Sequence, residues 1–321
     1  MPEHGGNLDA AVERFGGELS DWIDLSTGIN RQPYPLAGLP ASCWNALPSR
    51  SRIEVLHHAA QKAYGTQAPI LATHGAQAVI QWLPYLAPRG RARILNPTYN
   101  EYAAVFARSG WEVTETSDLD SLAGADIAVV VNPNNPDGKR YAPSQLLALL
   151  PRVGRLVVDE SFADAVPESS LARLAGQPRL LILRSFGKFF GLAGLRLGFV
   201  IGSEADVAAV SAKAGPWPVS GAAIEIGQRA LLDRAWAEAT SARLTRDCVR
   251  LDAMAAPLGW TLVGGTPLFR LYETGDADRA QENLARAQIW SRIFPQQKGW
   301  LRLGLPGNEA EWARLSAALA G

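Results

Sequence analysis

The residues best suited to chemistry lie in the segment Ser185-Phe186-Gly187-Lys188, and Arg196 follows eight residues after the lysine. Lys188 is one of five lysines in the chain, and its sequence neighbours are mostly phenylalanine and glycine. Apolar neighbours favour the neutral form of an amine, which is the form that attacks a carbonyl group. Ser185 and Arg196 add a hydroxyl and a guanidinium, which are groups that bind phosphate.

An amine nucleophile beside phosphate-binding groups indicates pyridoxal phosphate, because the aldehyde of this cofactor reacts with a lysine and its phosphate needs an anchor. Taken alone, the segment is equally compatible with a turn in the protein core from which the amine of Lys188 extends to solvent. The choice between these two interpretations depends on the other motifs of the chain.

Two motifs that follow predicted strands could complete such a site. The turn Asn132–Gly138 contains two prolines that restrict its backbone, and it could direct the amide of Asn135 toward a phenolic oxygen. Asp159 directly follows the apolar run Leu156–Val158, and a carboxylate at the end of a buried strand needs a partner. A protonated pyridine nitrogen is a suitable partner, and the pair keeps the ring able to accept electrons. The alternatives are an ordinary loop at Asn135 and a helix N-cap at Asp159.

Three further motifs could contribute binding groups. Gly75, Ala76 and Gln77 open a predicted helix, where backbone N–H groups bind phosphate, although a plain N-cap has the same pattern. Tyr99 follows a strand and could stack on a flat ring or simply pack in the core. Arg302 alternates with apolar residues on a late predicted strand, where it could bind a carboxylate through two hydrogen bonds or face solvent.

The composition argues against several classes of protein. The chain has 321 residues, of which 47% are hydrophobic and 19% charged, and its formal net charge is zero. Balanced charge argues against a nucleic-acid-binding protein, which usually carries excess basic charge. The two cysteines and four histidines lack the spacing of a metal site or a disulfide framework. Neither a secretory signal nor a membrane span is visible, so we expect a cytoplasmic protein without a bound metal.

The pattern of apolar residues predicts alternating strands and helices, which is typical of an α/β layer with a mostly parallel sheet. The first ~48 residues are rich in Gly and Pro and predict an arm with little regular structure. After the arm we expect helices at residues 53–64, 76–86, 101–109 and 143–150, and strands at residues 92–95, 111–115, 126–131, 155–158, 180–183 and 195–201. Such sheets bind ligands beyond the carboxyl ends of their strands, where Asn135, Asp159 and Lys188 fall.

A second, smaller α+β domain is predicted after Pro216-Trp217-Pro218, where the pattern changes. We expect one long or broken helix at residues 222–255, helices at 276–288 and 308–320, and strands at 260–263, 268–272, 289–294 and 300–303. The predicted large domain therefore covers residues 48–215, while residues 1–47 and 216–321 form the N-terminal arm and the small domain.

Taken together and in this order, the motifs resemble those of the fold type I pyridoxal-phosphate enzymes, which share the aspartate aminotransferase fold. The resemblance implies a large domain whose mostly parallel sheet has helices on both faces, a smaller α+β domain, and a homodimer. It implies that Lys188 binds the cofactor aldehyde, that Asp159 pairs with the ring nitrogen and that Asn135 binds the phenolic oxygen. It also implies that Tyr99 stacks on the ring and that Arg302 binds the substrate carboxylate. The residues implied for the cofactor phosphate are Gly75, Ala76, Gln77, Ser185 and Arg196.

Within that fold, the chain resembles the histidinol-phosphate aminotransferase branch, and most of all the threonine-phosphate decarboxylases of cobalamin synthesis. The start His4–Asn7 and the segment Ser26–Asn30 are similar to the N-terminus of the decarboxylases. Phe162 stands where aminotransferases of this branch usually have a tyrosine. The implied reaction is decarboxylation of L-threonine O-3-phosphate to (R)-1-amino-2-propanol O-2-phosphate. The residues implied for substrate binding are His4, Gly5, Asn30, Asn135 and Arg302.

Two other interpretations stay open at this point. An aminotransferase, for instance one acting on histidinol phosphate and 2-oxoglutarate, would use the same cofactor residues, and Phe162 disfavours it. A regulator or binding module with this fold would have little use for the retained lysine, aspartate and arginines. The chain departs from the family pattern at Leu47, where an aromatic residue often reaches the phosphate in the neighbouring subunit. Arg292 is a candidate for an additional contact with the substrate phosphate.

Overall fold

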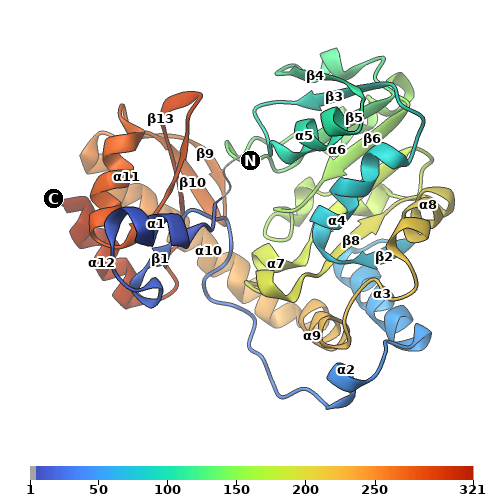
Figure 1. Cartoon of the computed structure of the whole chain (residues 1–321), viewed down its shortest axis with the longest axis horizontal. Coiled ribbons are helices and arrows are strands. Elements are labelled where there is room, and N and C mark those ends of the chain that lie inside the picture. The colour runs from blue at the N-terminus through green and yellow to red at the C-terminus, as the bar shows by residue number, and fades with distance from the viewer. Residues whose placement is uncertain (1–4, 321) are drawn as a thin grey trace. The chain divides into compact units, whose positions relative to one another are not determined.

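The computed structural model describes residues 5–320, which form two compact units (Figure 1). The larger unit contains Tyr34–Asn135 and Lys139–Ala237. The smaller unit contains the segment that ends at Pro33, the short stretch Pro136–Gly138 and the segment that begins at Glu238. The domain limits expected from the sequence stay a prediction.

The larger unit is built around a seven-stranded sheet. Its strands are β2 (Ile70–Thr73), β3 (Arg91–Leu95), β4 (Glu112–Thr116), β5 (Ile127–Val131), β6 (Arg155–Asp159), β7 (Leu180–Ser185) and β8 (Gly198–Ile201). They lie in the order β2-β8-β7-β6-β5-β3-β4. Only β8 runs antiparallel to its neighbours, and the other adjacent pairs are parallel. The α/β fold with a mostly parallel sheet is therefore confirmed.

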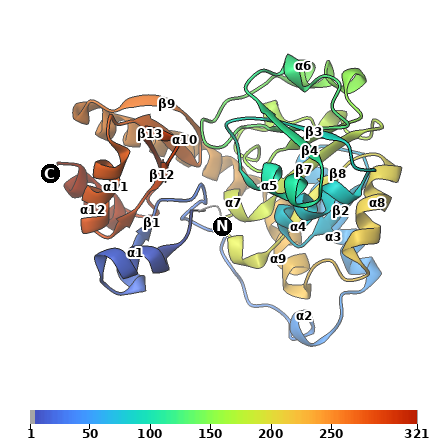
Figure 2. The same ribbon diagram turned by 45° about the horizontal axis from the view of Figure 1, so that its top comes forward.

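Helices cover both faces of this sheet (Figures 1 and 2). The helices of the larger unit are α2 (Ser42–Asn45), α3 (Arg50–Tyr64), α4 (Gly75–Trp82), α5 (Glu101–Arg108), α6 (Pro143–Leu147), α7 (Phe186–Phe189), α8 (Glu204–Ala214) and α9 (Gly221–Leu232). On one face, α4, α5 and α8 enclose an apolar core that includes Tyr102, Val157 and Leu183. On the other face, α3 packs against α9. Because successive strand residues point to opposite faces, each central strand contributes apolar side chains to both layers.

Two predictions for the elements around Lys188 are wrong in detail. β7 extends two residues beyond the predicted strand, to Ser185. The residues that follow form the short helix α7 rather than a simple turn. The strand predicted to start at residue 195 begins only at Gly198. A 3₁₀ turn at Ala193–Leu195 and a left-handed backbone at Arg196, with φ of 54°, precede it and interrupt the extended chain.

Other predictions failed where the sequence signal is weak. The N-terminal arm is not irregular throughout, since it contains α1 (Leu8–Phe15), β1 (Ile23–Asp24) and α2. β2 was not predicted from the sequence, because a run of only four apolar or small residues cannot be told from part of a buried helix by its pattern. α8 was not predicted either, because its apolar residues are too evenly distributed to mark one face.

The smaller unit combines antiparallel strands with helices. Besides α1 and β1, its elements are α11 (Ala277–Arg286), α12 (Glu309–Ala320), β9 (Thr261–Thr266), β10 (Phe269–Glu273), β11 (Ile289–Trp290), β12 (Arg292–Phe294) and β13 (Gln297–Gly304). Among the residues described there, β12-β13-β10-β9 form an antiparallel sheet, and β1 pairs with β11 in parallel. The strand predicted at 289–294 is therefore two strands, because its two halves pair with different partners.

The long or broken helix predicted at 222–255 is broken at Asp233, which ends α9 and precedes α10 (Arg234–Ala255). The chain passes from the larger to the smaller unit within α10. No helix within residues 5–320 is long and apolar enough to cross a membrane.

Candidate active site

Lys188 lies on α7, directly beyond the carboxyl end of the central strand β7. The start of this helix is tied to β8, since Ser185 pairs with Gly198 and the N–H of Phe186 donates to the carbonyl of Leu197 at 3.2 Å. The lysine is half-buried, and its Nζ lies 4.1 Å from the centroid of the Phe162 ring. Phe162 belongs to the loop after β6, so the lysine lies beside the loop that follows Asp159.

Aromatic side chains from distant parts of the chain hold α7 in place. Phe186 and Phe190 stack with centroids 4.3 Å apart, and Phe190 in turn stacks on Trp236 at 5.5 Å. Tyr34 packs edge-on against Trp236 at 5.2 Å, and its N–H donates to the carbonyl of Phe190 at 2.9 Å. These contacts explain the phenylalanines around Lys188, because they anchor the helix that carries the amine.

Asp159 is the last residue of β6, and both of its carboxylate oxygens accept hydrogen bonds. The hydroxyl of Tyr102 donates to Oδ2 at 2.7 Å, and the N–H of Ser161 donates to Oδ1 at 2.8 Å. Asp159 lies two residues after Val157 on β6, so the two side chains point to the same face of the sheet. That face is covered by α5, the helix that carries Tyr102. Burial, together with the nearby charge of Asp159, raises the pKa of Tyr102 well above its usual value, so its hydroxyl stays protonated.

Tyr102 was not predicted from the sequence. Its only local signal is its place three residues after Tyr99, which lies just before α5. That spacing places two tyrosines together but cannot show that one of them reaches the end of β6.

Gly75 and Arg196 lie against each other at the start of α4. Gly75 has φ of 72°, and a Cβ added there would lie 2.8 Å from Nη2 of Arg196. The absence of a side chain at Gly75 therefore lets the guanidinium lie against the start of α4. Ala76 follows in the first turn of α4, whose backbone N–H groups have no partner within the helix. A Cβ on Gly198 would lie 2.5 Å from the N atom of Ala76, which shows how closely β8 approaches this turn.

The side chain of Gln77 connects the start of α4 to α5. Its Nε2 donates to Glu101 at 3.2 Å, and its Oε1 accepts from the hydroxyl of Tyr99 at 3.2 Å. Burial and the charges of Glu101 and Asp159 raise the pKa of Tyr99 to about 12. Gln77 therefore orients the ring of Tyr99. Because both polar atoms of its side chain are hydrogen-bonded, a contact of Gln77 with a phosphate would use its backbone N–H.

Two other asparagines, both in the larger unit, hold the loop that carries Asn135. Asn132 bonds to Tyr141 in both directions, at 2.9 and 3.1 Å, and its N–H donates to the carbonyl of Asp159 at 2.8 Å. Asn134 donates to the carbonyl of Pro97 at 2.7 Å. Asn135 is half-buried next to these anchored residues. The amides of Asn132 and Asn134 are thus structural, which the sequence alone did not distinguish.

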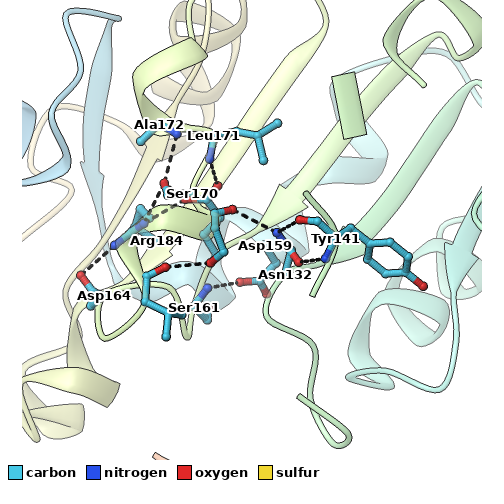
Figure 3. A network of polar contacts seen from close by, with 12 residues as sticks. Asn132, Tyr141, Asp159, Ser161, Asp164, Ser170, Leu171, Ala172 and Arg184 are labelled. Carbon is cyan, nitrogen blue, oxygen red and sulfur yellow. Dashed lines mark hydrogen bonds and ion pairs between the residues drawn. The ribbon is translucent and has the colours of Figure 1, made fainter. Parts of the chain in front are cut away.

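A buried ionic network joins the ends of β6 and β7 (Figure 3). Arg184 lies between two carboxylates, and its guanidinium donates to Glu160 at 2.9 Å and to Asp164 at 2.8 Å. Glu160 also accepts from the hydroxyl of Ser170 and from the N–H of Leu171. Both members of the pair are buried, with Arg184 3% and Glu160 0% exposed.

This network keeps Arg184 charged. Burial alone would lower its pKa, but the carboxylates of Asp164 and Glu160 outweigh burial and raise it. The guanidinium also lies 4.2 Å from the ring centroid of Tyr64 on α3. Because removal of one partner of a buried pair is costly, the network connects the strand end at Asp159 firmly to the strand that leads to Lys188.

In the smaller unit, Arg302 is buried on β13 and donates to the carbonyl of Ser26 at 2.6 Å. It lies opposite Arg292 in the register of β12 and β13. Burial and the charge of Arg292 lower the pKa of Arg302 to about 10, although Asp24 opposes the shift. Two guanidinium groups on facing positions repel each other, and a ligand with negative groups would relieve that repulsion.

Gly5 and Asn30, two of the three N-terminal candidates for substrate binding, lie in the smaller unit with Arg302. Gly5 packs so closely on Ser26 that an added Cβ would lie 2.5 Å from its carbonyl oxygen. Asn30 is buried, and its Oδ1 accepts from Nη2 of Arg243 at 2.7 Å. His4 lies outside the described residues. Gly5 and Arg302 therefore meet at Ser26, whereas the side-chain oxygen of Asn30 is engaged with Arg243.

The structure thus places the residues expected for the cofactor in the larger unit and brings four of them into contact in pairs, Gly75 with Arg196 and Gln77 with Tyr99. Lys188 contacts Phe162, which was not among the residues expected for the cofactor. The residues expected for the substrate lie mainly in the smaller unit. Their roles stay predictions.

Residues 43–319 match the family model described as aminotransferase class I and II. A threonine-phosphate decarboxylase of Pseudomonas aeruginosa is 42% identical over 331 residues, which cover 100% of this chain and 98% of that protein. Another protein of that name, from Sinorhizobium sp, is 43% identical over 325 residues, which cover 99% and 97%.

Among solved structures, the fold is shared with the histidinol-phosphate aminotransferase from Sinorhizobium meliloti in complex with pyridoxal-5'-phosphate. The TM-score is 0.82 at 19% identity, over 99% of this chain and 94% of that one. The family match covers far more than half of the chain, and the two sequence relatives cover nearly all of it. The chain therefore belongs to the class I and II aminotransferase family.

Proposed function

We propose that this protein is a pyridoxal-phosphate-dependent decarboxylase, which converts L-threonine O-3-phosphate to (R)-1-amino-2-propanol O-2-phosphate and carbon dioxide in cobalamin synthesis. One observation carries the proposal, namely the identity of 42% and 43% over nearly the whole chain to two proteins named threonine-phosphate decarboxylase. The geometry of the larger unit supports the cofactor, and the paired arginines of the smaller unit support a substrate with two anionic groups.

The larger unit offers groups that suit each part of pyridoxal phosphate. The guanidinium of Arg196 lies against Gly75 at the start of α4, where the backbone N–H groups of a helix suit a phosphate. The buried carboxylate of Asp159 suits a protonated ring nitrogen. Lys188, at the end of β7, supplies the amine that holds the aldehyde carbon. Tyr99 and Asn135 are proposed to contact the ring face and its phenolic oxygen.

When bound, pyridoxal phosphate draws electrons from the bond that breaks at Cα into its ring. Asp159 supports this role by keeping a proton at the ring nitrogen through its negative charge. The hydroxyl of Tyr102 and the N–H of Ser161 hold this carboxylate in place by donating hydrogen bonds to its two oxygens.

Lys188 is proposed to supply the proton that replaces carbon dioxide at Cα. With the cofactor bound, the Nζ ammonium of Lys188 would give its proton to Cα at the position that carbon dioxide leaves, and Nζ would remain as the neutral amine. The face of the Phe162 ring, 4.1 Å from Nζ, attracts the ammonium form. A tyrosine at this position would bring a hydroxyl, whereas Phe162 leaves the lysine next to an apolar ring.

Arg302 and Arg292 are proposed to bind the carboxylate and the phosphate of the substrate. They lie at facing positions on two antiparallel strands, and guanidinium groups bind both kinds of anion through paired hydrogen bonds. Gly5 and His4 are proposed to assist at the phosphate, and Asn30 to keep Arg243 in place nearby in the same unit.

We further propose that the protein acts in the cytoplasm as a homodimer. Trp44, Leu47 and Trp217 of the larger unit are 70%, 69% and 55% exposed. Exposed apolar side chains of this size suit an interface with another protein, and a second copy of the chain is the partner that the family resemblance implies. Leu47 would then lie near the interface without supplying the aromatic ring common in the family.

The proposal is tested by incubating the purified protein, loaded with pyridoxal phosphate, with L-threonine O-3-phosphate. We expect carbon dioxide and 1-amino-2-propanol O-2-phosphate to form in equal amounts, because each turnover releases one of each. The two products are quantified by trapping of carbon dioxide and by mass spectrometry.

The same protein is then mixed with histidinol phosphate or glutamate while the cofactor absorbance is followed. The decarboxylase should leave the cofactor in its aldehyde form. Rapid conversion to the pyridoxamine form, without release of carbon dioxide from the threonine ester, would instead assign the protein as an aminotransferase.

A further inference from the structure

We propose that Tyr102 is a positioning residue that holds Asp159 as a charged carboxylate in the orientation needed by the ring nitrogen of the cofactor. The inference rests on the proposed cofactor site but not on the choice between decarboxylation and transamination. It concerns a contact inside the larger unit, in which both side chains are described and buried.

The contact is short and fully enclosed. The Tyr102 hydroxyl donates to Oδ2 of Asp159 at 2.7 Å, with Tyr102 0% and Asp159 3% exposed. Oδ1 is held independently by the N–H of Ser161 at 2.8 Å. With one donor on each oxygen, the plane of the carboxylate is fixed, and its remaining lone pairs can serve a third donor. A ring N–H at the end of β6 is a donor of this kind.

The position of Tyr102 is itself rigid. Its ring belongs to the apolar core between α4, α5 and the sheet, where it packs with Val105, Phe106 and Val157. A hydroxyl attached to a ring in such a core has little freedom to find another acceptor. The Tyr102–Asp159 bond is therefore set by the packing of α5 on the sheet and does not depend on a mobile surface group.

Tyr102 also connects two predicted cofactor contacts. Its ring packs edge-on against Tyr99, with centroids 6.4 Å apart and planes at 84°. Tyr99 is oriented in turn by Gln77 at the start of α4. The segment just before α5 therefore presents one tyrosine proposed for the ring face, and α5 itself carries, three residues later, the tyrosine that holds the carboxylate for the ring nitrogen. A shift of α5 would disturb both contacts together.

The direction of the hydrogen bond determines its chemical effect. Burial and the charge of Asp159 keep the Tyr102 hydroxyl protonated, so this hydroxyl donates to the carboxylate. A donor stabilises the carboxylate more than the neutral acid. In a pair of a carboxylate and a protonated ring nitrogen, Tyr102 therefore favours the form with the proton on nitrogen. A tyrosine that merely filled space would have no such effect.

The experiment compares the wild-type protein with Tyr102→Phe after both are loaded with pyridoxal phosphate labelled with ¹⁵N in the ring. The ¹⁵N chemical shift reports directly whether the nitrogen is protonated, and no substrate is needed. We expect the shift of the variant to move toward the value of an unprotonated pyridine. We also expect the dissociation constant of the cofactor to rise about tenfold to a hundredfold, as loss of one hydrogen bond to a charged group predicts.

Tyr64→Phe is the matched control, because Tyr64 is also a buried tyrosine of the larger unit and its ring lies against Arg184. Its ¹⁵N shift should equal that of the wild type. Tyr102→p-aminophenylalanine should restore the wild-type shift, because it keeps an N–H donor at the same place. In an Asp159→Asn background, Tyr102→Phe should no longer change cofactor affinity, since the charged acceptor is absent.

An unchanged ¹⁵N shift and unchanged cofactor affinity in Tyr102→Phe would overturn the proposal. So would equal losses in Tyr64→Phe and Tyr102→Phe, which would indicate a general packing effect. If the protein binds the cofactor with the expected shifts but releases no carbon dioxide from the threonine ester, the proposed reaction fails while the role of Tyr102 stands.

Discussion

Lys188 shows how a single side chain acquires its role from its surroundings. It is half-buried on a one-turn helix that aromatic side chains hold from several directions, and its amine lies over the ring of Phe162. The short segment around it was compatible with an ordinary core turn, and only its place at the end of β7 distinguishes it from the other lysines. Lys213, for comparison, is exposed on α8.

Replacement of Lys188 by alanine should abolish the covalent attachment of the cofactor and nearly all turnover. The loss should be about a thousandfold or more, because the amine serves both as the anchor and as the proton donor. The measurements are the absorbance of the cofactor before and after denaturation, and the rate of carbon dioxide release. Lys213→Ala should keep both properties, and normal turnover in Lys188→Ala would show that the lysine is wrongly assigned.

At the scale of elements, the junction between α3 and β2 contains a histidine that must stay neutral. The Nε2 of His57 accepts a hydrogen bond from the N–H of Ala72 at 3.0 Å, which an imidazolium could not do. Burial, and then the neighbouring His58, lower the pKa of His57 to about 4, although Glu54 opposes the shift. β2 leads directly to Gly75, so this bond helps to place the proposed phosphate site.

The free energy of unfolding should therefore decrease as the pH falls from about 6.5 to about 4. The folded pKa lies below that of the unfolded chain, so in this window the unfolded chain binds the proton more strongly. The contribution is fully present above pH ~6.5 and amounts to about 2–3 kcal/mol. Urea unfolding at several pH values measures it.

His57→Gln keeps an acceptor for Ala72 without a titrating group, so its stability should depend less on pH in this window. His58→Gln is the matched control, because His58 is the exposed neighbour on the same helix. If His57→Gln and the wild type lost stability in parallel as the pH fell, the neutral histidine would not be the cause.

At the scale of the whole molecule, the exposed apolar side chains of the larger unit predict self-association. Trp217 lines a cavity together with Pro48, Ile53 and His57, on the same unit as the exposed Trp44. Trp217→Glu should weaken the proposed dimer about thirtyfold or more, as expected for an aromatic residue central to an interface. Sedimentation velocity over a range of concentrations measures the dissociation constant.

Val249→Glu is the control for this experiment, because Val249 is 67% exposed but lies on α10 in the smaller unit. It should leave the dissociation constant unchanged. A wild-type protein that sediments as a monomer at every concentration would contradict the homodimer, and equal effects of both substitutions would place the interface elsewhere.

Much of the fold was predictable because its signals are local. The apolar runs before Asn132, Asp159 and Ser185 predicted the buried strands β5, β6 and β7 close to their observed limits. Elements with a weaker signal were missed, such as β2, whose apolar run is only four residues long. The split of residues 289–294 into β11 and β12 was also missed, because strand pairing is decided by partners that are distant in the sequence.

The sequence by itself determined the family of this protein and the identity of its proposed catalytic groups, because motifs such as Ser185–Lys188 carry their chemistry in consecutive residues. Only the tertiary structure decided which side chains meet across elements. Tyr102 reaches Asp159, and Gln77 orients Tyr99, because α4 and α5 pack on one face of the sheet. Such contacts depend on the packing of a core, and no spacing along the chain encodes them.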